Sequence, residues 1–167
     1  MTAIDESGRW AADRARYGRN AWLLQPSFWA VSVYRFGRWT RTCSRVVRFP
    51  AHGLYLVLYS VVRLLTGIDI PRTVEIGPGI MIHHFGTVIV HPQARIGAQF
   101  TMRHGVTIGA KVGSDVPVIG DDVEVGAFAQ ILGPIHVGDG SKVGAMTLVL
   151  HDVPAGATVV GVPGRVL

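Results

Sequence analysis

The sequence predicts a mainly β fold, a parallel β-helix, preceded by an α-helical segment. Aliphatic residues recur at every sixth position over most of the chain after residue 69, and 21 of the 167 residues are glycine, nearly twice the average share of about 7%. Before residue 73 the composition differs: this part holds all four Trp, all four Tyr and eleven of the Arg residues. We therefore divide the chain into a helical segment, residues 1–67, and a β-helix domain, residues 68–167.

The six-residue repeat forms three series of aliphatic positions that we expect to point inward. They are Ile70, Ile76, Ile82 and Val88; after a slip of two residues, Val90, Ile96, Met102 and Ile108; and after a loop over 109–118, Ile119, Val125, Ile131, Val137, Val143 and Val149. This spacing fits a triangular coil whose three sides are short strands, each stacking one side chain on its copy in the next coil. Glycine follows seven of these positions, where we expect corner conformations that are costly for a Cβ atom.

The first part of the chain reads as helices. Pro26 and Ser27 are typical of a helix start, and we expect a helix over residues 28–43. A second helix is expected over residues 54–65, where six apolar residues follow the spacing of one helical face, with Gly67 ending it. These helices either pack on the rest of the protein or a neighbouring subunit, or present an Arg- and Trp-rich face to an anionic membrane. No nucleic-acid-binding motif accompanies the basic residues, so we expect no nucleic-acid partner.

Charge and hydropathy indicate where in the cell the protein is expected. The formal net charge is +5, and the first ten residues show no apolar segment behind a basic start, as a signal peptide would have. The most apolar stretch, residues 54–65, is interrupted by Arg63 and is shorter than the roughly 20 residues of a membrane span. We expect a cytoplasmic protein, with the basic helices as candidates for peripheral contact with the inner membrane.

Several segments carry a resemblance to a known family. They read GIDIPRTVEIGPGIMIHHFGTVIVHPQARIG over 67–97, then VTIG, VGAFAQILG, SKVGAMTLVL and GVPGRV. The chain resembles the bacterial hexapeptide-repeat acyltransferases, and among them serine O-acetyltransferases and their polysaccharide-locus relatives. The resemblance implies a left-handed β-helix, a homotrimer or dimer of trimers, active sites between adjacent prisms, and acetyl-CoA as the acyl donor.

Transfer of an acetyl group from a thioester to a hydroxyl needs a base for the hydroxyl proton and donors for the developing oxyanion. Histidine, with an unperturbed pKa of about 6.5, suits the first role near neutral pH. In the family the base follows a Gly-Ile-Met-Leu-Asp segment, and the resemblance places it at His84. It likewise implies that Asp69 orients the base. A carboxylate on the far ring nitrogen stabilises the imidazolium, so this pairing is chemically sensible.

Three further positions bear on the acceptor. Because one coil is eighteen residues and the slip adds two, we expect His104 to stack over His84, where it either contacts substrate or is simply a polar groove residue. His83 stands where the serine-specific enzymes have an Asp that helps to hold the amino acid, and Val116 stands where they have a second active-site His. Both departures remove partners for a zwitterion, which keeps open a neutral hydroxyl acceptor, such as a sugar of a polysaccharide or a related metabolite.

The resemblance also implies a coenzyme A site built from small residues and backbone amides, with cations near the nucleotide phosphates. The matching positions are Thr107, Gly109, Ala110, Ala127, Lys142, Ala145 and Arg165. We expect no metal, because the paired His ligands of hexapeptide-repeat carbonic anhydrases have no counterpart here. Covalent catalysis through the single Cys43 is disfavoured, since no His or acidic motif lies beside it. A non-enzymatic trimeric scaffold that docks on a membrane or partner remains as the alternative.

Overall fold

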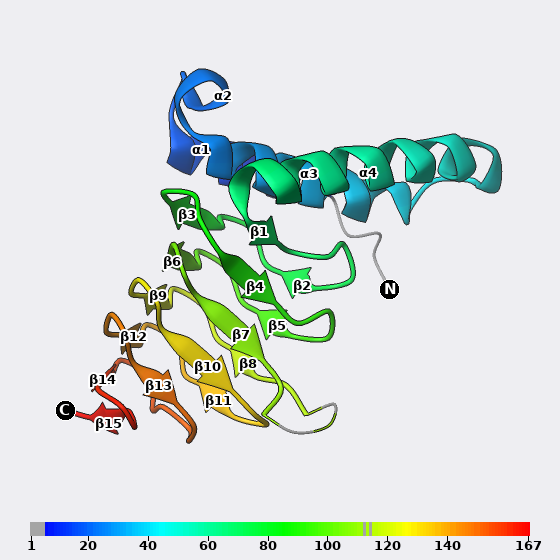
Figure 1. The fold of residues 1–167 in the computed structure, drawn as a ribbon. Coiled ribbons are helices and arrows are strands. Elements are labelled where there is room, and N and C mark those ends of the chain that lie inside the picture. The colour runs from blue at the N-terminus through cyan, green and yellow to red at the C-terminus, as the bar shows by residue number, and fades with distance from the viewer. Residues whose placement is uncertain (1–5, 112, 114) are drawn as a thin grey trace.

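Four helices and fifteen short strands make up the part of the chain that the computed structural model describes, residues 6–111, 113 and 115–167 (Figure 1). The helices are α1 (Glu6–Tyr17), α2 (Ala21–Leu24), α3 (Pro26–Thr40) and α4 (Arg45–Thr66). They lie together across one end of the coil of strands, and the chain enters the coil directly after α4 (Figure 1). The prediction of a parallel β-helix preceded by a helical segment is confirmed.

The strands form three sheets, which are the three sides of the prism. Sheet A contains β1 (Ile68–Asp69), β4 (Val88–Val90), β7 (Thr107–Gly109), β10 (Gln130–Leu132) and β13 (Leu148–Val149). Sheet B contains β2 (Glu75–Ile76), β5 (Arg95–Ile96), β8 (Val118–Ile119) and β11 (His136–Val137). Sheet C contains β3 (Met81–His83), β6 (Thr101–Arg103), β9 (Glu124–Val125), β12 (Lys142–Val143), β14 (Thr158–Val160) and β15 (Arg165–Val166). All pairings are parallel except that of β14 with β15.

The core runs along the axis of the prism. All fourteen aliphatic positions predicted to point inward are buried. A second buried row, which the six-residue pattern did not reveal, lies two residues before the first: Val74, Ile80, Ala94, Phe100, Val106, Val123, Ala129, Ile135, Ser141 and Thr147. This row varies from Ala and Ser to Phe, so its members share no residue type that a sequence pattern could show.

Two of the corner glycines, Gly77 and Gly126, have a different cause from the one expected. A Cβ at Gly77 would lie 2.5 Å from the backbone nitrogen of Ala98, and one at Gly126 would lie 2.4 Å from that of Ala145. Neither glycine has a positive φ; the backbone of the next coil simply approaches too closely for a side chain. The left-handed corner conformations belong instead to other residues, among them His84, with φ of 66°.

The predicted helices occur at the expected places in the chain, but the second of them is packed less than expected. A helix starts at Pro26, as expected, and α4 ends at Gly67, whose φ of 69° is left-handed. However, α4 begins at Arg45 and has 22 residues, so it is long and apolar enough to cross a membrane, by length and composition alone. Most of its predicted apolar stripe is not packed within the described chain: Val57 is 62% exposed, and of the stripe only Val62 packs against the core.

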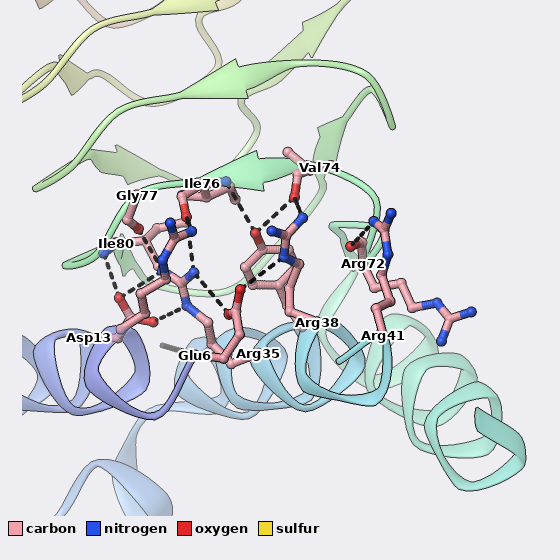
Figure 2. Close-up of polar contacts among 12 residues, drawn as sticks. Glu6, Asp13, Arg35, Arg38, Arg41, Arg72, Val74, Ile76, Gly77 and Ile80 are labelled. Carbon is pink, nitrogen blue, oxygen red and sulfur yellow. Dashed lines mark hydrogen bonds and ion pairs between the residues drawn. The ribbon is translucent and has the colours of Figure 1, made fainter. Parts of the chain in front are cut away.

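Polar side chains of α1 and α3 close the first coil, where strands have no preceding coil to bond to. Tyr34 donates its hydroxyl hydrogen to Val74 O (3.0 Å) and accepts from Ile76 N (3.2 Å). Burial raises the pKa of Tyr34 to about 12, so the phenol keeps the hydrogen that it donates. Arg35 donates to Ile76 O (3.0 Å) and Gly77 O (2.6 Å), as Figure 2 shows.

The same layer holds a buried cluster of ion pairs (Figure 2). Arg35 Nε lies 2.6 Å from Asp13 Oδ2, and Arg38 Nε lies 3.2 Å from Glu6 Oε1, all four side chains being almost inaccessible to solvent. Asp13 Oδ1 also accepts from the backbone nitrogens of Gly79 (2.8 Å) and Ile80 (2.9 Å). Arg35 and Arg38 are therefore committed to the first coil, which for these two residues fits the first of the two alternatives, packing on the rest of the protein.

We expect Asp13→Asn to lower the free energy of unfolding by about 3–5 kcal/mol, because it leaves the buried Arg35 guanidinium without its closest anion. Chemical denaturation would measure the change. Glu75→Gln is the matched control, since the Glu75–Arg95 pair is mostly exposed (3.7 Å) and its loss should cost less than about 1 kcal/mol. Equal losses in the two variants would contradict a structural role for the buried cluster.

Candidate active site

His84 lies on the wall of a cavity of about 280 Å³ between the first coil and the helical segment. The coil contributes Met81, His83, His84 and Phe85, and the link from α2 into α3 contributes Leu24, Gln25, Pro26 and Ser27. Ser27 fixes this link by donating from its hydroxyl to Ile82 O (2.8 Å). None of the lining residues is acidic, and the imidazoles of His83 and His84 are the only ionisable side chains among them.

The expected stacking of His104 over His84 is confirmed. In the parallel pairing of β3 with β6, Ile82 faces Met102 and His83 faces Arg103, so the next pair in register is His84 and His104. Their ring centroids are 5.9 Å apart with the rings nearly perpendicular. The ring of His104 also packs edge to face against that of Phe128, with the ring centroids 5.0 Å apart. The buried Nδ1 of His104 has no hydrogen-bond partner among the described residues, although buried polar atoms usually have one.

Asp69 has other partners in this structure. Its carboxylate accepts a hydrogen bond from the Tyr59 hydroxyl and lies 3.4 Å from Arg63 Nη1, both on α4. Burial, and next to it the bond to this carboxylate, raises the pKa of Tyr59. Among the described residues, no hydrogen bond or ion pair joins Asp69 to His84, so its role in orienting the base stays a prediction.

A groove of about 460 Å³ runs from His83 along the outer face of sheet C. It is lined by His83, Thr101, Arg103, Glu124, Val125, Gly126, Ala127, Lys142, Val143, Gly144 and Ala145. Three of the predicted coenzyme A positions, Ala127, Lys142 and Ala145, are therefore gathered along one surface. Because His83 also lines the cavity of His84, the groove and the cavity share a wall.

The remaining predicted cofactor positions lie elsewhere on the prism. Thr107 and Gly109 belong to β7 in sheet A, and Ala110 follows directly. Arg165 lies in β15, at the edge of sheet C. Thr107, Gly109, Ala110 and Arg165 do not line the groove; the single chain thus presents two groups of candidate positions on different sides.

The structure adds residues that sequence reasoning did not single out. The segment Leu24–Ser27 forms one wall of the cavity, and Phe85, which is 54% exposed, forms another part of it. Arg103 lines the groove beside His83. No sequence signal links residues 24–27 to residues 81–85, because they meet only when the helices close the end of the coil.

Comparison with known proteins identifies the family. Residues 117–151 match the model "Bacterial transferase hexapeptide (six repeats)". The chain is 38% identical to a Serine acetyltransferase of Helicobacter pylori over 86% of its own length and 84% of that protein. The chain belongs to the serine acetyltransferase family.

Other family members match over a smaller part of their own length. A Serine acetyltransferase of Synechococcus elongatus is 36% identical over 92% of this chain, which spans 62% of that relative. Among solved structures, soybean serine acetyltransferase complexed with serine superposes with a TM-score of 0.81 (38% identity, 96% of this chain and 68% of that one). A serine acetyltransferase in complex with CoA gives a TM-score of 0.79 (29% identity, 97% and 68%).

The surroundings of His83 predict a lowered pKa for its imidazole. Burial, followed by the positive charge of Arg103 and the neighbouring His84, lowers the pKa of His83 from its ordinary value of 6.5. An NMR titration should give a midpoint below 6.5, and Arg103→Gln should move it upward. Arg95→Gln, which removes a cation in sheet B, is the control and should leave it unchanged.

The lowered pKa of His83 makes the stability of the fold depend on pH. Below pH 6.5 an unfolded chain binds a proton at this histidine before the folded chain does, so this site lowers the stability of the fold as the pH falls through that window. A His83 midpoint above 6.5 would contradict the interpretation.

Proposed function

We propose that this protein is an acetyl-CoA-dependent O-acetyltransferase, similar in activity to serine acetyltransferases. The observation that carries the proposal is the position of His84, in a cavity that shares His83 with a groove lined by small residues. The groove suits the pantetheine arm of coenzyme A, and a family member of the same fold has been solved in complex with CoA. Because acetyl-CoA is a metabolite of the cell interior, we also propose a cytoplasmic location.

In the proposed reaction, His84 takes the proton of the acceptor hydroxyl as its oxygen attacks the carbonyl carbon of the thioester. The C–O bond forms, the carbonyl oxygen becomes an oxyanion, and backbone N–H groups lining the groove stabilise it. The intermediate then collapses with cleavage of the C–S bond, and the imidazolium returns the proton to the departing thiolate. Asp69 is proposed to stabilise that imidazolium, which requires its carboxylate to turn from Tyr59 and Arg63 towards the ring.

Two acceptors are supported by different observations. L-Serine is supported by the names of the relatives and by the soybean enzyme complexed with serine. A neutral hydroxyl, such as that of a sugar, is supported by the cavity itself, because no carboxylate among its lining residues could pair with the ammonium group of an amino acid. His83 is proposed to contact the acceptor in either case, and His104 to line the same site.

We propose a homotrimer as the active form, alone or as a dimer of trimers. The support is the separation of the cofactor positions: Ala127, Lys142 and Ala145 lie along the groove, whereas Thr107 and its neighbours lie on sheet A. Neighbouring copies around a threefold axis would bring the groove of one prism against another side of the next, so that both groups could contact one coenzyme A. Arg165 is proposed to lie near its phosphates.

We expect His84→Ala to reduce kcat by about 10²- to 10⁴-fold, the usual contribution of a general base. Thiol release from acetyl-CoA would be measured with serine, homoserine and sugar acceptors. His151→Ala, which removes an exposed histidine outside both cavity and groove, should keep wild-type turnover. Full activity of the His84 variant would refute the mechanism, whereas activity on serine alone would refute only the neutral acceptor.

Lys142→Gln should raise the KM for acetyl-CoA about tenfold, with a smaller effect on kcat, because a cation near the phosphates contributes mainly to binding. Arg95→Gln is a closely matched control. Both cations are exposed and both pair with a glutamate on the neighbouring coil, Lys142 with Glu124 at 3.4 Å and Arg95 with Glu75 at 3.7 Å. An equal change in KM in both variants would argue for a general charge effect and against a cofactor site at Lys142.

A further inference from the structure

One face of α4 is apolar, exposed and without a partner in the part of the chain that the structure describes. Tyr55 marks the buried side of the helix. The exposed residues on the other side are Val46 (84% exposed), Phe49 (86%), Val57 (62%) and Leu64 (86%). We call these four residues, together with Leu54, Val61 and Leu65, the α4 apolar face. Exposed apolar patches of this extent on soluble proteins usually mark an interaction site.

The charge around this face indicates the kind of partner. No acidic residue occurs between Asp13 and Asp69, whereas nine arginines do. Arg35 and Arg38 are used in the first coil, and Arg63 lies 3.4 Å from Asp69. Arg45 has no ion-pair partner among the described residues, and Arg48 bonds only to the backbone oxygens of Arg41 and Cys43. Two arginines without an ion-pair partner among the described residues, Arg45 and Arg48, thus lie at the start of α4, where the apolar face also begins.

We propose that the α4 apolar face docks on an anionic lipid surface. An exposed apolar stripe flanked by arginines, without acidic residues, is the pattern of helices that lie in the headgroup region, where apolar side chains enter the acyl boundary and cations meet lipid phosphates. Two copies of the chain meeting through this face would instead bring like charges together. This docking is separate from the acetyl-transfer chemistry, which it would place next to the membrane.

The packing of α4 favours lying along the surface over crossing it. In Figure 1, α4 runs alongside α3; its C-terminal part lies over the end of the prism, and its N-terminal part extends beyond the strands. The Tyr55 ring fills the space above Gly37 of α3, where a Cβ would lie 2.3 Å from its Cε2, and its hydroxyl accepts from Arg72 N (3.2 Å). A helix held in this way along one side has only its opposite side free for lipid.

The test is cosedimentation of the full chain with vesicles of phosphatidylcholine, with and without phosphatidylglycerol. We expect binding to the anionic vesicles only, weakened when salt is raised from about 0.05 M to about 0.5 M. Leu64→Glu should weaken it at least about tenfold, since it buries a charge in place of an apolar side chain. Arg45→Gln should weaken it about fivefold, as expected for one cation at an anionic surface.

Leu167→Glu is the matched control: it is the same substitution at a similar exposure (83% against 86%) in the C-terminal residue, and it should bind vesicles as the wild type does. Circular dichroism and thiol release would confirm that each variant is folded. The proposal is overturned if the wild type stays in the supernatant with anionic vesicles, or if both Leu variants lose binding equally. It is also overturned if light scattering shows that Leu64→Glu dissociates an oligomer while vesicles are ignored, because the face would then join copies of the chain.

Discussion

The structure depends on how the first coil of the β-helix is terminated. Every later strand of the parallel stack bonds to the coil before it, but the first coil has backbone groups with no such partner, and leaving them buried and unpaired would be costly. Here side chains replace the missing coil. Asp13 accepts from two consecutive backbone N–H groups, Tyr34 both donates and accepts, and Arg35 donates to two carbonyls.

This termination also explains the unusual composition of the helical segment. A guanidinium can reach two carbonyls at once and still pair with a carboxylate, so Arg35 satisfies several groups from one position on α3. The arginines of α3 that suggest a membrane-facing surface are turned inward for this reason. Arg45 and Arg48, which have no ion-pair partner among the described residues, lie on α4, where many apolar side chains are also exposed.

The helices that cover the first coil also give the candidate site its shape. By covering the first coil, the helices bring residues 24–27 against the turn that carries His84, and so turn an exposed corner into a cavity. The bond from Ser27 to Ile82 O ties that wall to the strand before the base. The groove of sheet C, by contrast, is built only from repeats of the coil, which is why small residues such as Ala127 and Ala145 recur along it.

The sequence by itself determined the coil and the stacking of His104 over His84, because both follow from the period, and its motifs carried the family resemblance. A six-residue spacing fixes which side chains point inward, and a count of residues per coil fixes which ones stack. Only the tertiary structure decided the second buried row, the inward turn of Arg35 and Arg38, the cavity wall at residues 24–27 and the bonds of Asp69 to α4. These depend on contacts between segments far apart in the chain, and no local pattern encodes which polar groups a helix will meet when it closes the end of a prism.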